Sequence, residues 1–229
     1  TICSGIAFTV TPTNGSGNIV PSGTTYTWTT PISNPVGAIT GGTAQATGVA
    51  TISQTLTNTT TAPATLEYTV TPTSGACAGT PFTITVTVNP TPTTLGLTNQ
   101  TYCNGIPTTQ IVLTNGVSGT TYAWTNSNTA IGLAASGTGN IPVFTPTNSG
   151  TSPISATISI IATANGCSRA AETFTITVNP SPVVSFSPAI QNICSGDTSA
   201  LVTLSSTTSG ATFSWTATQP AGITGVITS

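Results

Sequence analysis

The sequence predicts an all-β protein made of tandem antiparallel β-sandwiches, and three observations predict it. A pattern of Cys, aromatic-x-Trp, Cys and Asn-Pro recurs along the chain. Apolar residues alternate with threonine in short runs, as they do in strands that bury one face. Turn signals such as Asn-Gly and Ser-Gly separate these runs, and no segment has the period of a helix. Short strands at this spacing are typical of two-sheet sandwiches.

The recurring pattern occurs twice in full and once in part. Its first copy consists of Cys3-Ser4-Gly5, Tyr26-Thr27-Trp28, Cys77 and Asn89-Pro90. The second consists of Cys103-Asn104-Gly105, Tyr122-Ala123-Trp124, Cys167 and Asn179-Pro180. The third consists of Cys194-Ser195-Gly196 and Phe213-Ser214-Trp215. Cys77 and Cys167 are 90 residues apart, and Cys103 and Cys194 are 91 apart, so each copy has the length of a small sandwich with its own core.

This period predicts three domains. They cover residues 1–91, residues 92–181 and a partial third repeat over residues 182–229. The second and third copies carry a longer segment before their first cysteine than the first copy does, so we expect the first domain to lack its leading strand. The chain begins without Met or a signal segment, and we expect it to be a piece of a longer protein.

The individual strands follow from the alternation. In the first repeat, strands are predicted over 66–71 and 82–88, with a turn at Ser74-Gly75 between them. In the second repeat, strands are predicted over 109–113, 121–125, 154–161 and 172–178. Residues 131–139 are Gly-rich and predicted to form a loop with a short edge strand, and Asn165-Gly166-Cys167 is predicted to turn.

Five cysteines in this repeated arrangement predict disulfides. Cys3 is expected to pair with Cys77, and Cys103 with Cys167, inside each repeat, while Cys194 has no partner in this chain. Such bridges point to an oxidising, extracellular setting. Each would stabilise its domain by on the order of 4 kcal/mol in the chain-entropy model. The alternative is five reduced, buried cysteines. A zinc site is not expected, because the sequence has no His and no C-x2-C spacing.

Two further features of the repeat each allow a structural and a functional interpretation. Trp28, Trp124 and Trp215 are predicted to be core aromatic residues packed between the sheets, although exposed tryptophans could stack on sugars. The Asn-Pro-x-Pro segments at 89–92 and 179–182 are interpreted as semi-rigid joints rather than polyproline recognition motifs.

Charge is nearly absent, and this excludes several functions. Only 2% of residues are charged, against about 25% in ordinary soluble domains. Nucleic acid is therefore not an expected partner, since nothing can neutralise its phosphates. The ionisable groups Glu67, Glu172, Asp197 and Arg169 form no catalytic constellation without His or Lys, so we expect no enzyme, no cofactor and no metal site. Arg169 and Glu172 could pair across a turn, an interaction to which we assign no function. Asn58-Thr59-Thr60 matches a glycosylation sequon.

The residues quoted above resemble those of a known family. Ile2-Cys3-Ser4-Gly5 and its two counterparts, each followed by Tyr/Phe-x-Trp and the first two closed by a Thr-alternating strand with Asn-Pro, look like the PKD-like repeats of very large surface proteins in gliding Bacteroidetes, of the SprB-like gliding adhesin type. The resemblance covers the whole chain. It implies immunoglobulin-like β-sandwiches, export by type IX secretion, and a filament of tandem repeats that a motor moves along the outer membrane surface.

One departure limits what the resemblance carries. PKD domains usually follow their Trp with a Gly-Asp-Gly type turn, whereas Trp28 is followed by Thr29-Thr30-Pro31. Any function attached to that acidic turn is therefore not transferred.

Three functions are compatible with this sequence. The first is a non-catalytic segment of a cell-surface adhesin that serves attachment and gliding motility. Its expected partners are neighbouring repeats, a substratum or surface polysaccharide, and, through regions outside this chain, the secretion and gliding machinery. The second is a spacer that presents a separate secreted enzyme or ligand-binding domain. The third is a ligand-binding surface on threonine rows such as Thr83, Thr85 and Thr87.

Overall fold

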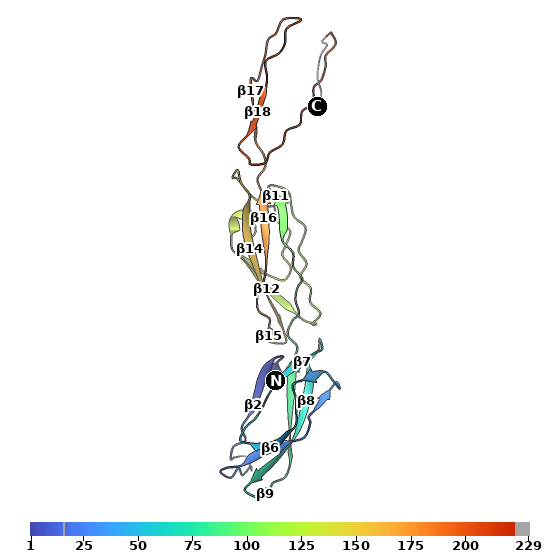
Figure 1. Cartoon of the computed structure of the whole chain (residues 1–229), viewed down its shortest axis with the longest axis vertical. Coiled ribbons are helices and arrows are strands. Elements are labelled where there is room, and N and C mark those ends of the chain that lie inside the picture. Colours follow the sequence, from blue (N-terminus) through green and yellow to red (C-terminus); the bar gives the residue numbers. More distant parts are fainter. Residues whose placement is uncertain (16, 223–229) are drawn as a thin grey trace.

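The computed structural model describes residues 1–15 and 17–222, and it confirms the all-β fold. Two sandwiches and a third, smaller segment follow one another along the long axis of the molecule (Figure 1). The amino terminus lies at the joint between the two sandwiches rather than at an end of the molecule (Figure 1). Residues 223–229 of the predicted third repeat lie outside the described residues.

The first sandwich packs two sheets against each other. One sheet has the order β1-β10-β8-β3-β6, with β4 and β9 also paired to β8, and the other has the order β2-β7-β5. The strands are β1 (Ile2–Cys3), β2 (Ile6–Val10), β3 (Thr25–Trp28), β4 (Ile32–Asn34), β5 (Ile39–Thr40), β6 (Gln45–Val49), β7 (Ile52–Asn58), β8 (Ala64–Ser74), β9 (Cys77–Ala78) and β10 (Phe82–Asn89). All pairs are antiparallel except β1 with β10, where Cys3 lies opposite Asn89.

The alternating pattern explains this packing. Along β8, Leu66, Tyr68 and Val70 are buried between the sheets, while Glu67 and Thr69 face outward. Val86 and Val88 of β10 are buried in the same way. The buried side chains of both sheets form one hydrophobic cluster, to which β2 contributes Phe8.

The second sandwich repeats the larger sheet. Its order is β11-β16-β14-β12-β13, with β15 paired to β14, and β11 is again parallel to the closing strand β16. The elements are β11 (Gln100–Cys103), β12 (Thr121–Asn126), the 3-10 turn η1 (Thr129–Ile131), β13 (Ser136–Thr138), β14 (Ile154–Ala164), β15 (Cys167–Ser168) and β16 (Glu172–Asn179). A separate cluster of buried residues, which includes Ile158, Ile160 and Ile176, forms its core.

The predicted strand over 109–113 is wrong. Only an isolated bridge joins Ile111 to Ile141 in this part of the second sandwich. The amides on either side of the bridge do not continue a regular ladder, because the Leu113 amide donates to the Asn140 side chain and the Thr108 amide donates to Phe144 O. The remaining predicted strands of the second repeat lie within β12, β14 and β16.

The third segment forms a hairpin rather than a sandwich. β17 (Val184–Ser187) pairs with β18 (Thr203–Ser206). Among the described residues its sheet has these two strands alone, so no equivalents of β14 and β16 cover the hairpin there. The predicted domain limits, including the shortened start of the first domain, stay predictions.

Candidate functional site

The joint between the two sandwiches contains the disulfide and the ion pair of the described residues. Cys3 of the first sandwich is bonded to Cys167 of the second, with Cα atoms 5.5 Å apart and a sequence separation of 164. The predicted pairings of Cys3 with Cys77 and of Cys103 with Cys167 are therefore wrong. Cys77, Cys103 and Cys194 are free and exposed.

The closing strand explains why the two cysteines of one repeat do not meet. Cys3 pairs with Asn89 at the end of β10, whereas Cys77 pairs with Ser74, beyond the start of that strand. Eight residues of strand span about 26 Å, at roughly 3.3 Å for each residue. Because a disulfide needs Cα atoms within about 7 Å, the two cysteines of one sandwich lie too far apart.

The Cys-Ser-Gly motif fixes the leading cysteine at the end of the sandwich that faces the next repeat. The Ser4 amide donates to Asn89 O at 2.9 Å, and the Gly5 amide donates to Leu56 O at 2.8 Å. The Ser4 hydroxyl accepts a hydrogen bond from the Asn58 amide at 2.9 Å. These bonds tie the first turn of the chain to both sheets, and they hold Cys3 beside the last residue of β10.

The second repeat builds the same arrangement with Asn104 in place of Ser4. The Asn104 and Gly105 amides donate to Asn179 O and Pro146 O. The Asn104 side-chain oxygen accepts from the Asn148 amide at 2.8 Å. Ser and Asn are thus interchangeable after the cysteine because both supply an acceptor oxygen to the same backbone amide.

A buried asparagine completes this end of each sandwich, and sequence reasoning missed its role. The Asn58 amide group donates to Ala62 O and Val88 O, both at 2.8 Å. Asn148 donates in the same way to Ser152 O and Val178 O. The spacing of 90 residues, equal to that of Cys77 and Cys167, was the available signal. With 7% of its surface exposed and its amide nitrogen occupied, Asn58 is not a glycosylation acceptor in the folded chain.

The hairpin between β14 and β15 carries Cys167 to the joint. Its loop residues, Asn165 and Gly166, both have positive φ, of 50° and 78°, as an Asn-Gly hairpin turn requires. The Asn89 side chain of the first sandwich donates to Asn165 O at 2.8 Å. Asn89, the residue of the Asn-Pro motif, therefore contacts the same hairpin that the disulfide holds.

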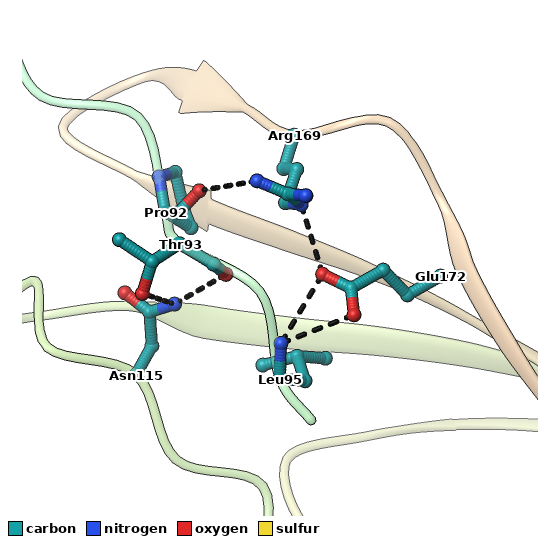
Figure 2. Close-up of polar contacts among 6 residues, drawn as sticks. All are labelled: Pro92, Thr93, Leu95, Asn115, Arg169 and Glu172. Carbon is teal, nitrogen blue, oxygen red and sulfur yellow. Dashed lines mark hydrogen bonds and ion pairs between the residues drawn. The ribbon is translucent and has the colours of Figure 1, made fainter. Parts of the chain in front are cut away.

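The only arginine of the chain clamps the linker that joins the sandwiches (Figure 2). Arg169 Nε lies 2.8 Å from Glu172 Oε1, and its guanidinium donates to Pro92 O at 3.5 Å. Both Glu172 carboxylate oxygens accept from the Leu95 amide, at 3.2 and 3.1 Å. A carboxylate that accepts from a backbone amide makes a charge-assisted hydrogen bond, which is stronger than a neutral one. The pair therefore fixes the linker, a role not assigned from the sequence.

The same linker is also held from a second side. The Asn115 side chain donates to Thr93 O at 2.7 Å (Figure 2). The neighbouring Gly116 faces the first sandwich, since a Cβ there would lie 3.7 Å from the Thr61 methyl group. The joint is thus closed by the cysteine hairpin on one side and by the loop that contains Asn115 on the other.

The three tryptophans do not share one environment. Trp28 is 5% exposed, and its indole nitrogen donates to Thr43 O at 2.8 Å. Trp124 is 3% exposed and packs over Gly137, where no Cβ would fit, and its indole nitrogen lacks a hydrogen-bond partner. Trp215 was expected in a core but is 53% exposed, since the sheet of the third segment consists of β17 and β18 alone in the described part of the chain.

The described residues contain no group of three His, Cys, Asp or Glu side chains that could hold a metal ion. No helix among them is long and apolar enough to cross a membrane. Burial raises the pKa of Tyr26, Tyr68, Tyr102 and Tyr122, most of all that of Tyr68, which is fully buried. Tyr26 and Tyr68 lie in the first core, and Tyr102 and Tyr122 pack against the second.

Comparisons with known proteins agree with a repeat of this kind in the first sandwich. A family model described as a PKD-like domain matches residues 1–92. No curated protein matches the chain. Among solved structures, the chain is similar to mouse cadherin-23 EC22-24, with 14% identity over 82% of this chain and 66% of that one, at a TM-score of 0.35. It is also similar to protocadherin gamma B2 extracellular cadherin domains 1-5, with 17% identity over 90% of this chain and 44% of that one, at a TM-score of 0.30.

Proposed function

We propose that this chain is a non-catalytic, extracellular part of a rod in which sandwich repeats are held end to end. The observation that carries the proposal is the Cys3–Cys167 disulfide, which joins two sandwiches instead of closing one. A bridge inside a domain stabilises that domain, whereas a bridge between domains restricts their relative motion. Disulfides of this kind persist outside the reducing cytosol. The Arg169–Glu172 clamp on the linker acts in the same direction.

The finer proposal is that the rod belongs to a cell-surface adhesin for attachment and gliding motility. Its outward faces support this, because paired strands β8 and β10 present hydroxyl groups such as Thr69 opposite Thr83. Contacts made by a nearly uncharged surface depend little on salt. Many weak contacts along a repeated surface add up to firm attachment to a substratum or surface polysaccharide. Type IX secretion and anchoring at the outer membrane belong to this proposal, through regions outside the chain.

A spacer role is the second candidate. The joint supports this role, because its disulfide, its ion pair and the hydrogen bonds to the linker all fix one sandwich against the next. In this case the repeats would present a separate secreted enzyme or ligand-binding domain at a distance from the cell. The two candidates share the rod and differ in whether the repeats themselves touch a surface.

Antibody fragments raised against the purified chain test both statements on intact cells that make the protein. The rod proposal expects labelling without permeabilisation and its loss after external protease. The adhesin proposal further expects that the bound fragments block attachment and gliding, whereas surface labelling with normal attachment selects the spacer. Labelling that needs permeabilised cells overturns the extracellular location and both candidates.

A further inference from the structure

The cysteines occupy two repeated positions, and the one bonded pair uses one of each. The leading cysteines, Cys3 and Cys103, both lie opposite the asparagine that ends the closing strand, Asn89 and Asn179. The hairpin cysteines, Cys77 and Cys167, both begin a two-residue strand after a two-residue turn. The bond joins the leading cysteine of the first repeat to the hairpin cysteine of the second.

Figure 1 places these positions at opposite ends of each sandwich. β9, with Cys77, lies at the end of the first sandwich away from the joint, and β15, with Cys167, lies at the end of the second sandwich that faces the joint. β11 runs toward the third segment and brings Cys103 to that end of the second sandwich. Cys3 lies at the end of the first sandwich that faces the second. Cys103, which is exposed, lies in the same way at the end of the second sandwich that faces the third segment.

The second joint shares one contact with the first, made by a glycine-containing turn. The turn before Trp124 is repeated before Trp215: Gly119 and Gly210 both have a φ of 74°. In the third segment, the Ser209 amide donates to Thr151 O at 3.4 Å. Thr151 follows Thr61 by 90 residues, and Thr61 is the residue that faces the corresponding turn at the first joint. The turn of the third segment therefore contacts the second sandwich at the position that corresponds to Thr61 of the first.

We propose that the leading cysteine of every repeat is bonded to the hairpin cysteine of the next, so that Cys103 is the attachment point for the following repeat and Cys77 for the preceding one. The inference rests on the extracellular setting of the proposed function. The oxidant is a disulfide such as glutathione disulfide. The Cys103 thiolate displaces one glutathione, and the partner thiolate then displaces the second from the mixed disulfide. Two protein thiols are oxidised to one disulfide, and glutathione disulfide is reduced to two thiols.

These bonds would create a covalent path that bypasses the cores. From Cys77 the chain runs along β10, the linker and β11 to Cys103, with a sequence separation of 26. From Cys167 to Cys194 the separation is 27, and this segment likewise contains the closing strand β16 and an Asn-Pro joint. Each such segment begins at a hairpin cysteine and ends at a leading cysteine. The disulfide at its end joins it to the segment that begins two repeats further along the chain. Tension along the filament would pass through extended segments and disulfides, and the sandwich bodies would not be stretched.

Stretching single molecules of the full chain tests the path that is already present. The 164 residues closed by Cys3–Cys167 should add no length while the bond is intact. Reduction, or Cys167→Ser, should lengthen the unfolded chain by roughly 550 Å, at about 3.4 Å for each residue. Cys194→Ser is the matched control and should behave like the unchanged chain. Equal unfolded lengths with and without reductant would overturn the proposal.

Duplicating residues 92–181 directly after Ser181 tests the pairing rule. The inserted copy carries Ser118→Thr and Ala171→Thr, two exposed positions, so that its peptides have distinct masses. After refolding with glutathione disulfide, alkylation of free thiols and chymotrypsin digestion, peptide 103–122 of the original repeat should be joined to peptide 145–174 of the inserted one. With Cys103→Ser in the original copy, peptide 145–174 of the inserted copy should no longer be joined to peptide 103–122. Peptide 1–8 should still be joined to peptide 145–174 of the original copy.

Two results would overturn the rule. One is an inserted copy whose own leading and hairpin cysteines are joined to each other. The other is an alkylated Cys103 beside an inserted copy that hydrogen exchange shows to be folded. An insertion that does not fold leaves the decision to the stretching measurement, which uses the unaltered sequence. Neither measurement depends on where the protein is located, so failure of the pairing rule is distinct from failure of the proposed function.

Discussion

The two sandwiches each contain a larger sheet of the same topology, and they differ in the layer that packs against it. In the first, β2 pairs with β7 over five residues and forms a regular second sheet. In the second, the corresponding segments form one isolated bridge between Ile111 and Ile141, and otherwise meet through irregular bonds such as that from the Thr108 amide to Phe144 O. The shared sheet carries the leading strand, the closing strand and the cysteine hairpin. The structure is thus repeated where one sandwich contacts the next, and it varies where only the core has to be covered.

The cores differ accordingly. The first contains an aromatic group in which Tyr68 contacts Phe8 and Trp28, with ring centroids 5.2 and 6.0 Å apart. The second is mainly aliphatic and seats Trp124 against Gly137. Comparing the same substitution in both sandwiches therefore separates what the repeat requires from what each core adds.

The largest expected effect is common to both sandwiches. Asn58→Ala removes four hydrogen bonds from a buried side chain, and Asn148→Ala removes three. Each substitution should lower the free energy of opening of its own sandwich by about 3–4 kcal/mol, at about 1 kcal/mol per bond. Hydrogen exchange followed by mass spectrometry reads each sandwich separately. If one substitution destabilises its sandwich and the other does not, the two asparagines do not have equivalent roles.

Gly137→Ala should affect only the second sandwich. The added methyl group would overlap the Trp124 ring, which is fixed in the core, and overpacking of this kind costs about 2 kcal/mol. The matched change in the first sandwich is Gln45→Ala, because Gln45 lies opposite Trp28, and it should cost under about 0.5 kcal/mol. Hydrogen exchange again provides the measurement, and equal costs would refute the difference in tryptophan packing.

Replacing each tryptophan with phenylalanine tests the indole nitrogens. Trp28→Phe removes the bond to Thr43 O, whereas Trp124→Phe removes an N–H that has no partner. The first substitution should therefore cost about 1 kcal/mol more than the second, in addition to the loss of ring area common to both. Urea denaturation of both variants, followed by circular dichroism, measures the difference. A larger cost at Trp124 would contradict it.

Alkaline pH should weaken the first sandwich through Tyr68, whose pKa is raised by burial. In the unfolded chain this phenol ionises near pH 10, while the buried phenol keeps its proton. Its contribution to stability is therefore complete below about pH 10 and is lost as the pH rises toward the higher folded pKa. Tyr68→Phe should flatten the fall in stability of the first sandwich between about pH 10 and 12, and leave the second sandwich unchanged. An unaltered slope would argue against this assignment.

Periodicity in the sequence was enough to predict the strands of the shared sheet. β8, β10, β14 and β16 alternate buried and exposed residues as the threonine pattern indicates. The strand predicted over 109–113 is wrong because its residues alternate as in a strand, whereas the neighbouring amides of Thr108 and Leu113 bond outside a regular ladder. The buried asparagines were missed because a single polar residue has no distinctive local pattern, and their role depends on contacts with Val88 and Val178, 30 residues further along the chain.

The sequence by itself determined the all-β fold, the repeat length and the positions of the cysteines, since these depend on local alternation and on spacing. Only the tertiary structure decided which cysteines meet. Pairing depends on which end of a strand a residue occupies, and the parallel pairing of β1 with β10 moves Cys3 away from Cys77 and toward Cys167 of the next sandwich. The arginine and glutamate acquired a role in the same way, because the fold brings the linker against their hairpin.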